Sequence, residues 1–242
     1  HFMRQQIGFL AIYQRKTGLR IGGVVEKLER GVCWLLMLVP VLWWHAQLPR
    51  QFAWFKPGDF IQGLPNMVVI LATSLLLLLS ICWIFLRWKA REQVGPRDLW
   101  IMTTGIVWFG GIVWTNSDLA FTLSNCIAHG IPYLVLVWWT GHRQWKINRN
   151  GPQPKEFFQK RNIWLFVSIL MAMGILEELG WDVFVWHDHP QLFGAGLKLS
   201  PWLINIAVGL LSVPQVTHYI LDGVIWRSAE FPELKMVFRD NI

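Results

Sequence analysis

The amino-acid sequence predicts an all-α, polytopic transmembrane helix bundle that forms a single integral membrane domain over residues 1–242. Of the 242 residues, 54% are hydrophobic and only 15% are charged, whereas ordinary soluble domains carry about 25% charged residues. Six stretches approach the roughly 17 to 25 apolar residues that a helix needs to cross the hydrocarbon of a bilayer. The connections between these stretches alternate in positive charge.

The chain begins with a partial span at residues 1–12. This segment is followed rather than preceded by its cations, so it does not resemble a signal peptide. We interpret it as the inner half of a span and expect further residues to precede it. The six complete spans are expected at residues 31–48, 65–88, 99–114, 119–140, 162–179 and 201–226. Pro40 and Pro214 should kink or locally open their helices, because each removes a backbone hydrogen bond.

The number of Lys and Arg residues in the connections predicts an orientation. In chain order the connections carry five, two, four, zero, six and one of these cations, and the C-terminal tail carries three. Short loops rich in Lys and Arg stay on the cytoplasmic side. We therefore expect the C-terminus in the cytoplasm and the chain in a bacterial inner membrane. The net charge of +7 is expected to face anionic lipid headgroups, and no nucleic-acid partner is indicated.

The informative residues are polar side chains inside the spans, since these usually face the bundle interior and mark a site. The ionisable ones are His1, His129, Glu177, Glu178, His218 and Asp222, with Gln5, Asn125 and Gln215 nearby. Three pairs lie four residues apart and so share a helix face, namely His1 with Gln5, Asn125 with His129, and His218 with Asp222.

The depth of these residues follows from a rise of about 1.5 Å per residue from the nearest cytoplasmic cation. His1 and His129 both lie roughly 21 Å from the inner surface, Glu177 roughly 24 Å and His218 roughly 14 Å, on the same helical rise. Three helices are therefore expected to bring imidazole or carboxylate groups to similar depth. Such convergence is what an interior metal or proton site requires.

Three short segments carry a resemblance to known proteins. They read HFMRQQIGF with YQRK, NCIAHGIPY with VW, and HYILDGVIWR, about thirty-five residues together. They resemble a group of uncharacterised bacterial multi-pass membrane proteins, some of which are labelled as similar to the membrane carotene-cleaving dioxygenases. The activity of those dioxygenases is attributed to His-bound iron. The resemblance implies a metal-dependent membrane oxidoreductase or oxygenase that acts on a lipid or isoprenoid substrate entering from the bilayer.

Neutral imidazole with carboxylate suits iron and similar transition metals, and open positions on iron permit oxygen chemistry. In this interpretation the metal ligands are His1, His129 and His218, with Glu177 or Glu178 as a carboxylate ligand. The side chains of Gln5, Asn125 and Asp222 would orient the imidazoles. No residue is assigned a catalytic role. The dense histidine clusters of the di-iron desaturases are missing, which counts against that class.

Each of these residues also has a structural interpretation. A single His in a transmembrane helix is often a hydrogen-bond partner between helices, and His129 fits that role equally well. Glu177 and Glu178 fit pairing or exposure near the outer interface. A haem between His129 and His218 is a less favoured alternative to a bound metal ion, and the His187 to His189 segment is expected to be solvated.

Three functional classes therefore stay open. The first is the metal-dependent oxidoreductase. The second is a non-catalytic integral subunit or scaffold of a larger membrane complex, with membrane lipids and other subunits as partners. The third and weakest is a transporter, because Pro214 and the acidic residues within spans are features found along transport pathways.

Overall fold

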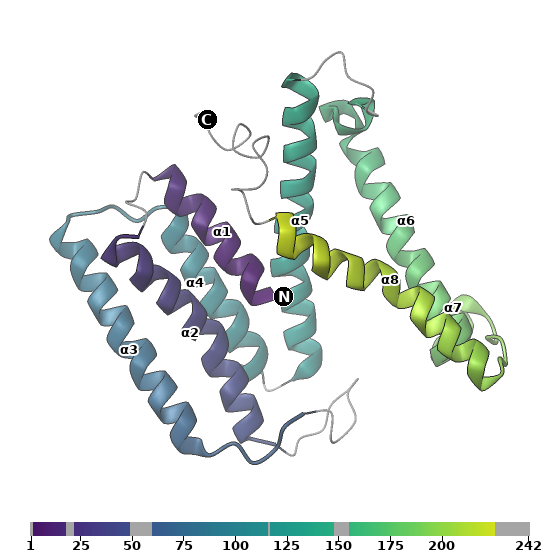
Figure 1. The fold of residues 1–242 in the computed structure, drawn as a ribbon, viewed down its shortest axis with the longest axis horizontal. Coiled ribbons are helices and arrows are strands. Elements are labelled where there is room, and N and C mark those ends of the chain that lie inside the picture. The colour runs from purple at the N-terminus through teal and green to yellow at the C-terminus, as the bar shows by residue number, and fades with distance from the viewer. Residues whose placement is uncertain (1, 18–21, 49–59, 116, 148–154, 226–242) are drawn as a thin grey trace. The chain divides into compact units, whose positions relative to one another are not determined.

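The computed structural model describes residues 2–17, 22–48, 60–115, 117–147 and 155–225, and these residues form helices and no strand (Figure 1). The predicted all-α class is therefore confirmed. The chain divides into two compact units, His1–Tyr133 (unit 1) and Leu134–Ile242 (unit 2). That the whole chain forms one membrane domain stays a prediction.

Unit 1 is a bundle built around one central helix. Its elements are α1 (Phe2–Lys16), α2 (Val24–Ala46), α3 (Asn66–Lys89), α4 (Pro96–Trp108), the π-helix η1 (Phe109–Trp114) and the first part of α5 (Asp118–Ile147). The central helix α2 packs against α3, α4 and α1, as Figure 1 shows. Its buried positions follow two helical stripes, one through Cys33 and Met37 and the other through Val32 and Val39. A helix buried on two faces needs neighbours on both sides.

Glycines allow the closest approaches in unit 1. A Cβ on Gly111 of η1 would lie 2.8 Å from the Cα of Phe121 on α5, a backbone atom that cannot move aside. A Cβ on Gly105 would lie 3.2 Å from a methyl carbon of Leu36 on α2. The absence of a side chain at both glycines thus permits these contacts between helices.

Unit 2 contains the rest of α5 and a helix pair. Its other elements are η2 (Lys155–Phe158), η3 (Lys160–Asn162), α6 (Ile163–Trp181), the π-helix η4 (Asp182–Trp186), α7 (Pro190–Phe193) and α8 (Pro201–Ile225). α6 packs against α8, where a Cβ on Gly180 would lie 2.8 Å from the Leu211 Cδ2 atom. The end of α5 is joined to η2 by His142, whose Nδ1 lies 2.7 Å from the backbone oxygen of Phe158.

Four helical segments among the described residues are long and apolar enough to cross a membrane, namely Asn66–Lys89, Leu119–Arg143, Lys160–Trp186 and Pro201–Leu221. They indicate an integral membrane protein. The other two predicted spans fall on α2 and on α4 with η1, and neither is both long and apolar enough to be counted with these four. The first two turns of α2 carry four charged residues, and α4 has only 13 residues before η1 begins. The helices α2 and α8 continue through Pro40 and Pro214.

Candidate functional site

A polar link joins α1 to α5 at two of the residues singled out from the sequence. Gln5 is only 1% exposed, and its Nε2 donates a hydrogen bond to the backbone oxygen of His129 at 3.2 Å. The Gln5 Oε1 contacts the Nδ1 of the His129 ring. Since a carbonyl oxygen can only accept, this contact requires the proton on Nδ1. The ring of Phe2 packs edge-on against the imidazole at 4.6 Å, and that of Tyr133 stacks at 6.2 Å.

Asn125, one turn before His129, is also buried at 1% exposed. Neither its Oδ1 nor its Nδ2 has a hydrogen-bond partner among the residues that the structure describes. The structure thus brings Gln5, from another helix, to the His129 ring. Sequence reasoning paired Gln5 with His1 and Asn125 with His129 on local spacing alone.

Of the other predicted site residues, Glu177, Glu178 and His218 belong to unit 2. His1 and the side chain of Asp222 lie outside the described residues. Glu177 and Glu178 are exposed on α6, as their structural interpretation expects. His218 is half-buried on α8 of unit 2, with its ring 6.0 Å from that of Tyr219. Among the described side chains, no three His, Cys, Asp or Glu residues are grouped closely enough to hold a metal ion, so the predicted ligand set stays a prediction.

A buried ionic cluster lies at one end of unit 1, and its centre is Glu29 on α2. This carboxylate has no exposed surface. Its Oε1 lies 3.3 Å from the Arg97 Nε and 3.5 Å from the Arg87 Nη1. The same oxygen accepts a hydrogen bond from the Trp83 Nε1 at 3.3 Å, and Oε2 accepts one from the Gln14 Nε2 at 2.8 Å.

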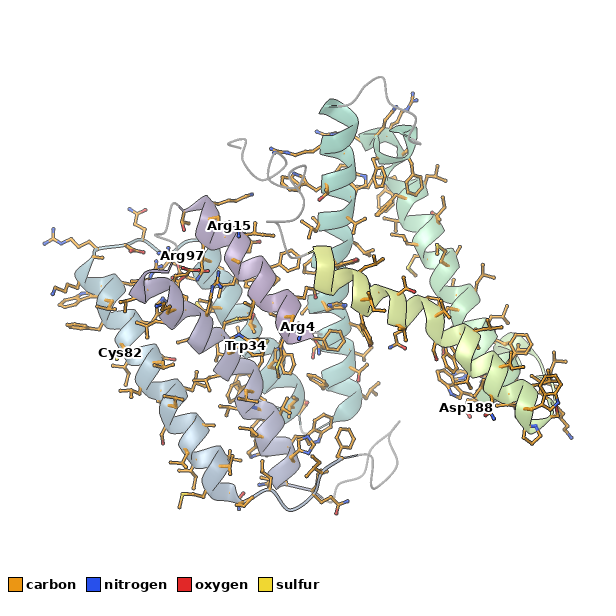
Figure 2. All side chains as sticks on the ribbon, viewed as in Figure 1. Arg4, Arg15, Trp34, Cys82, Arg97 and Asp188 are labelled. Carbon is orange, nitrogen blue, oxygen red and sulfur yellow. The ribbon has the colours of Figure 1, made fainter. Side chains whose placement is uncertain are left out.

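The two arginines extend the ionic cluster to further acids. Arg87 pairs with Asp98 at 3.0 Å and with Glu92 at 3.2 Å. Arg97 also pairs with Glu92. We define the ionic cluster as Glu29, Arg87, Glu92, Arg97 and Asp98. Figure 2 labels Arg97 at the start of α4, at this end of unit 1. The cluster joins α2, α3 and α4, and Gln14 adds α1. Buried charges are tolerated when they are paired in this way.

Sequence reasoning missed the ionic cluster, because it treated Arg87 and Arg97 only as cations of a cytoplasmic connection. A signal was present in the acids. Glu26 precedes Arg30 by one helical turn, and the two form an ion pair at 2.6 Å. Acids at helical spacing beside cations, at the start of an apolar helix, indicate a paired and partly buried end.

A second buried carboxylate organises the segment after α6. Asp182 is 1% exposed, and its Oδ1 accepts backbone hydrogen bonds from Asp188 and His189, both at 2.9 Å. The same oxygen lies 3.4 Å from the Nδ1 of His189. His187 and His189 are both exposed, as predicted for solvated residues. The segment is nonetheless built on Asp182, which the sequence did not single out.

The Gln5 to His129 link and the ionic cluster connect helices of unit 1 through polar groups, whereas Asp182 organises the segment that follows its own helix. The imidazole of His129 is oriented, the charges of the ionic cluster are paired, and Asp182 positions one exposed imidazole. Comparison with protein-family models, with curated proteins and with solved structures finds no match to this chain.

Proposed function

We propose that the chain is a non-catalytic integral subunit or scaffold of a larger membrane complex. The observation that carries this proposal is the Gln5 to His129 link, which uses the most prominent predicted ligand as a contact between helices. Polar side chains commonly connect transmembrane helices in this way. The paired charges around Glu29 support the same interpretation.

The surfaces of the four apolar helices support partners in the membrane. In the most apolar stretch of each, at most 6% of the residues are buried. Such surfaces are covered by lipid tails or by the helices of other subunits. Membrane lipids and further membrane subunits are therefore the proposed partners.

The topology that we propose has six complete spans, with α2 and the α4 to η1 segment added to the four apolar helices. The C-terminus lies in the cytoplasm, and the host membrane is a bacterial inner membrane. Support comes from the alternation of Lys and Arg among the connections. Pairing of Glu29, Arg87 and Arg97 lowers the cost of placing the charged ends of α2 and α4 near the membrane.

Metal analysis of the purified full chain, combined with its assembled mass after mild solubilisation, tests the proposal. We expect less than stoichiometric transition metal and an assembly heavier than the 28.2 kDa chain. One equivalent of metal per chain that is lost in His129→Gln would overturn it. His45→Gln is the matched control, since that ring instead contacts the backbone oxygen of Ile61.

A metal-dependent oxidoreductase acting on a lipid or isoprenoid is the second candidate, and one observation favours it. Histidines that bind metals usually donate their other ring N–H to an acceptor, and Gln5 accepts from the His129 Nδ1. In that case Nε2 would be the ligand atom. The same metal analysis decides between the candidates, because stoichiometric iron supports the second alone.

A further inference from the structure

At the end of unit 1 that holds the ionic cluster, acidic and basic side chains are separated between the interior and the surface. The acids described there are Glu26, Glu29, Glu92 and Asp98. Glu26, Glu29 and Asp98 are buried, and the partly exposed Glu92 pairs with both Arg87 and Arg97. Ion pairing therefore keeps most of the negative charge of this end away from its surface.

The charged side chains that remain on the surface are mainly cations. The exposed ones are Arg15, Lys16, Lys27, Lys89 and Arg91, and we call this surface the cationic end. Its elements are joined from inside, because the Arg97 Nη1 donates to the Thr17 Oγ1 at 3.2 Å and Glu29 links α2 to α3 and α4. Figure 2 labels Arg15 and Arg97, both at this end of unit 1. Within the described part of the chain, the side chains of Lys27, Lys89 and Arg91 form no ion pair.

Arg91 is held in a backbone conformation that its side chain disfavours. Its φ is 54°, in the left-handed region where a glycine usually ends a helix. The backbone N–H groups of Arg91 and Glu92 donate to the carbonyls of Trp88 and Arg87 at 3.0 and 3.1 Å, which closes the last turn of α3. The Arg87 Nη2 also donates to the Gln93 carbonyl at 2.7 Å, so the ionic cluster fixes the turn. An arginine that is kept at such a position points to a use for its charge.

The cationic end adjoins a surface suited to lipid. α3 is apolar enough to cross a membrane and ends at Lys89. Near that end, Phe85 is 54% and Trp88 is 75% exposed, and tryptophan rings favour the headgroup level of a bilayer. Basic residues beside the cytoplasmic end of a membrane helix attract anionic lipids. Continuity with the exposed apolar side chains of α3 favours a lipid over an acidic protein as the partner.

We propose that the cationic end binds the headgroups of anionic phospholipids, with Lys89 and Arg91 pairing with their phosphate oxygens. A guanidinium can donate two parallel hydrogen bonds to a phosphate, and an ammonium supplies a point charge. The buried ionic cluster serves this binding, because it pairs the acids of this end and positions the turn that carries Arg91. The proposal rests on the membrane embedding of the proposed function.

The test uses the full chain in nanodiscs of equimolar phosphatidylcholine and phosphatidylglycerol. Native mass spectrometry counts the lipids of each class that stay bound after release from the disc. We expect phosphatidylglycerol to be retained preferentially. Lys89→Gln and Arg91→Gln should each weaken its binding about fivefold, the usual effect of one cation near an anionic surface. Lys198→Gln is the control, since it removes an exposed cation of unit 2, outside the cationic end.

Arg91→Gly separates lipid binding from folding. Glycine adopts the left-handed conformation without strain, so this variant should unfold at a higher temperature and still bind phosphatidylglycerol about fivefold more weakly. A misfolded variant would lose both properties together. Equal retention of the two lipids by the unaltered chain, or unchanged retention in all three variants of Lys89 and Arg91, would overturn the proposal.

Incorporation into nanodiscs of phosphatidylcholine alone is measured first. A chain that incorporates but shows no preference for phosphatidylglycerol contradicts the lipid site and leaves the embedding intact. A chain that does not incorporate contradicts the embedding itself. Polyglutamate that binds the incorporated chain and is weakened by the same variants, without any lipid preference, would assign the cationic end to an acidic protein and overturn the proposal.

Discussion

Glu29 carries a negative charge at a position with no exposed surface. Taking a carboxylate out of water costs several kcal/mol, which is offset only when paired cations and hydrogen bonds surround it. Here Arg87 and Arg97 supply the cations, and Trp83 and Gln14 supply N–H donors. The net stabilisation is small, but without the Glu29 charge Arg97 keeps, among the described residues, only the partly exposed Glu92 as a counter-charge, and Arg87 keeps Glu92 and Asp98.

Replacing Glu29 by Gln should therefore lower the free energy of unfolding of unit 1 by about 3 to 5 kcal/mol, the usual cost of breaking a buried pair. Unfolding of the detergent-solubilised chain by a denaturing detergent measures it. Lys27→Gln is the control at an exposed position of the same helix and should change stability by less than about 0.5 kcal/mol. An equally small effect at Glu29 would show that the charge is not paired.

The Gln5 to His129 link is testable by a double-mutant cycle. Gln5→Leu and His129→Leu should each destabilise the chain, and their coupling should be about 0.6 to 1.7 kcal/mol, as for other hydrogen bonds between membrane helices. Thermal unfolding in detergent measures each corner of the cycle. A coupling near zero would mean that the two side chains do not hold α1 to α5.

At the scale of elements, the close contact between η1 and α5 depends on Gly111, which has no side chain. Gly111→Ala should destabilise unit 1 by about 1 to 3 kcal/mol, the range for overpacking, because its Cβ would meet the Phe121 backbone. Gly130→Ala is the matched control, since a Cβ there meets nothing within 4 Å. It should be neutral or slightly stabilising, because Ala favours a helix over Gly. Equal effects of both substitutions on thermal unfolding would contradict the close approach.

Helix positions could be predicted because their signals are local. The spans expected at 65–88 and 201–226 correspond to α3 (Asn66–Lys89) and α8 (Pro201–Ile225). Each apolar run ends at a proline or a charge. The sequence predicts a span that starts at residue 31, whereas α2 begins at Val24. The charged first turns of α2 resemble a connection in the sequence, because the arginines of α3 and α4 that pair with Glu29 are distant along the chain.

Contacts between distant residues were not predictable in the same way. Gln5 and His129 lie 124 residues apart, and helical spacing assigned each a partner on its own helix. A cavity of about 70 Å³ lined by Gln6 of α1, Trp108 of α4 and Ala128 of α5 depends on three helices at once. The close approach of α5 to Gly111 in η1 likewise joins residues of two helices. Such features are set by packing, which periodicity in one segment does not report.

For the whole molecule, the proposed topology places residues 56 and 149 on opposite sides of the membrane. Both lie outside the described residues. In intact cells, a membrane-impermeant thiol reagent should label Lys56→Cys and leave Arg149→Cys unlabelled until the cells are opened. The chain without added cysteine is the control, because its three native cysteines fall within predicted spans. Labelling of both positions from one side would reject six spans in this orientation.

The ionic cluster also has a consequence for how the protein is made. Glu29 leaves the ribosome a whole helix before Arg87 and longer still before Arg97. During that interval α2 carries an unpaired charge, so it should linger at the insertion machinery until α3 and α4 arrive. Chains truncated after α2 should accordingly be extracted from membranes by alkali, whereas chains truncated after α4 should resist. Biogenesis of unit 1 would thus proceed by joint release of three helices rather than one helix at a time.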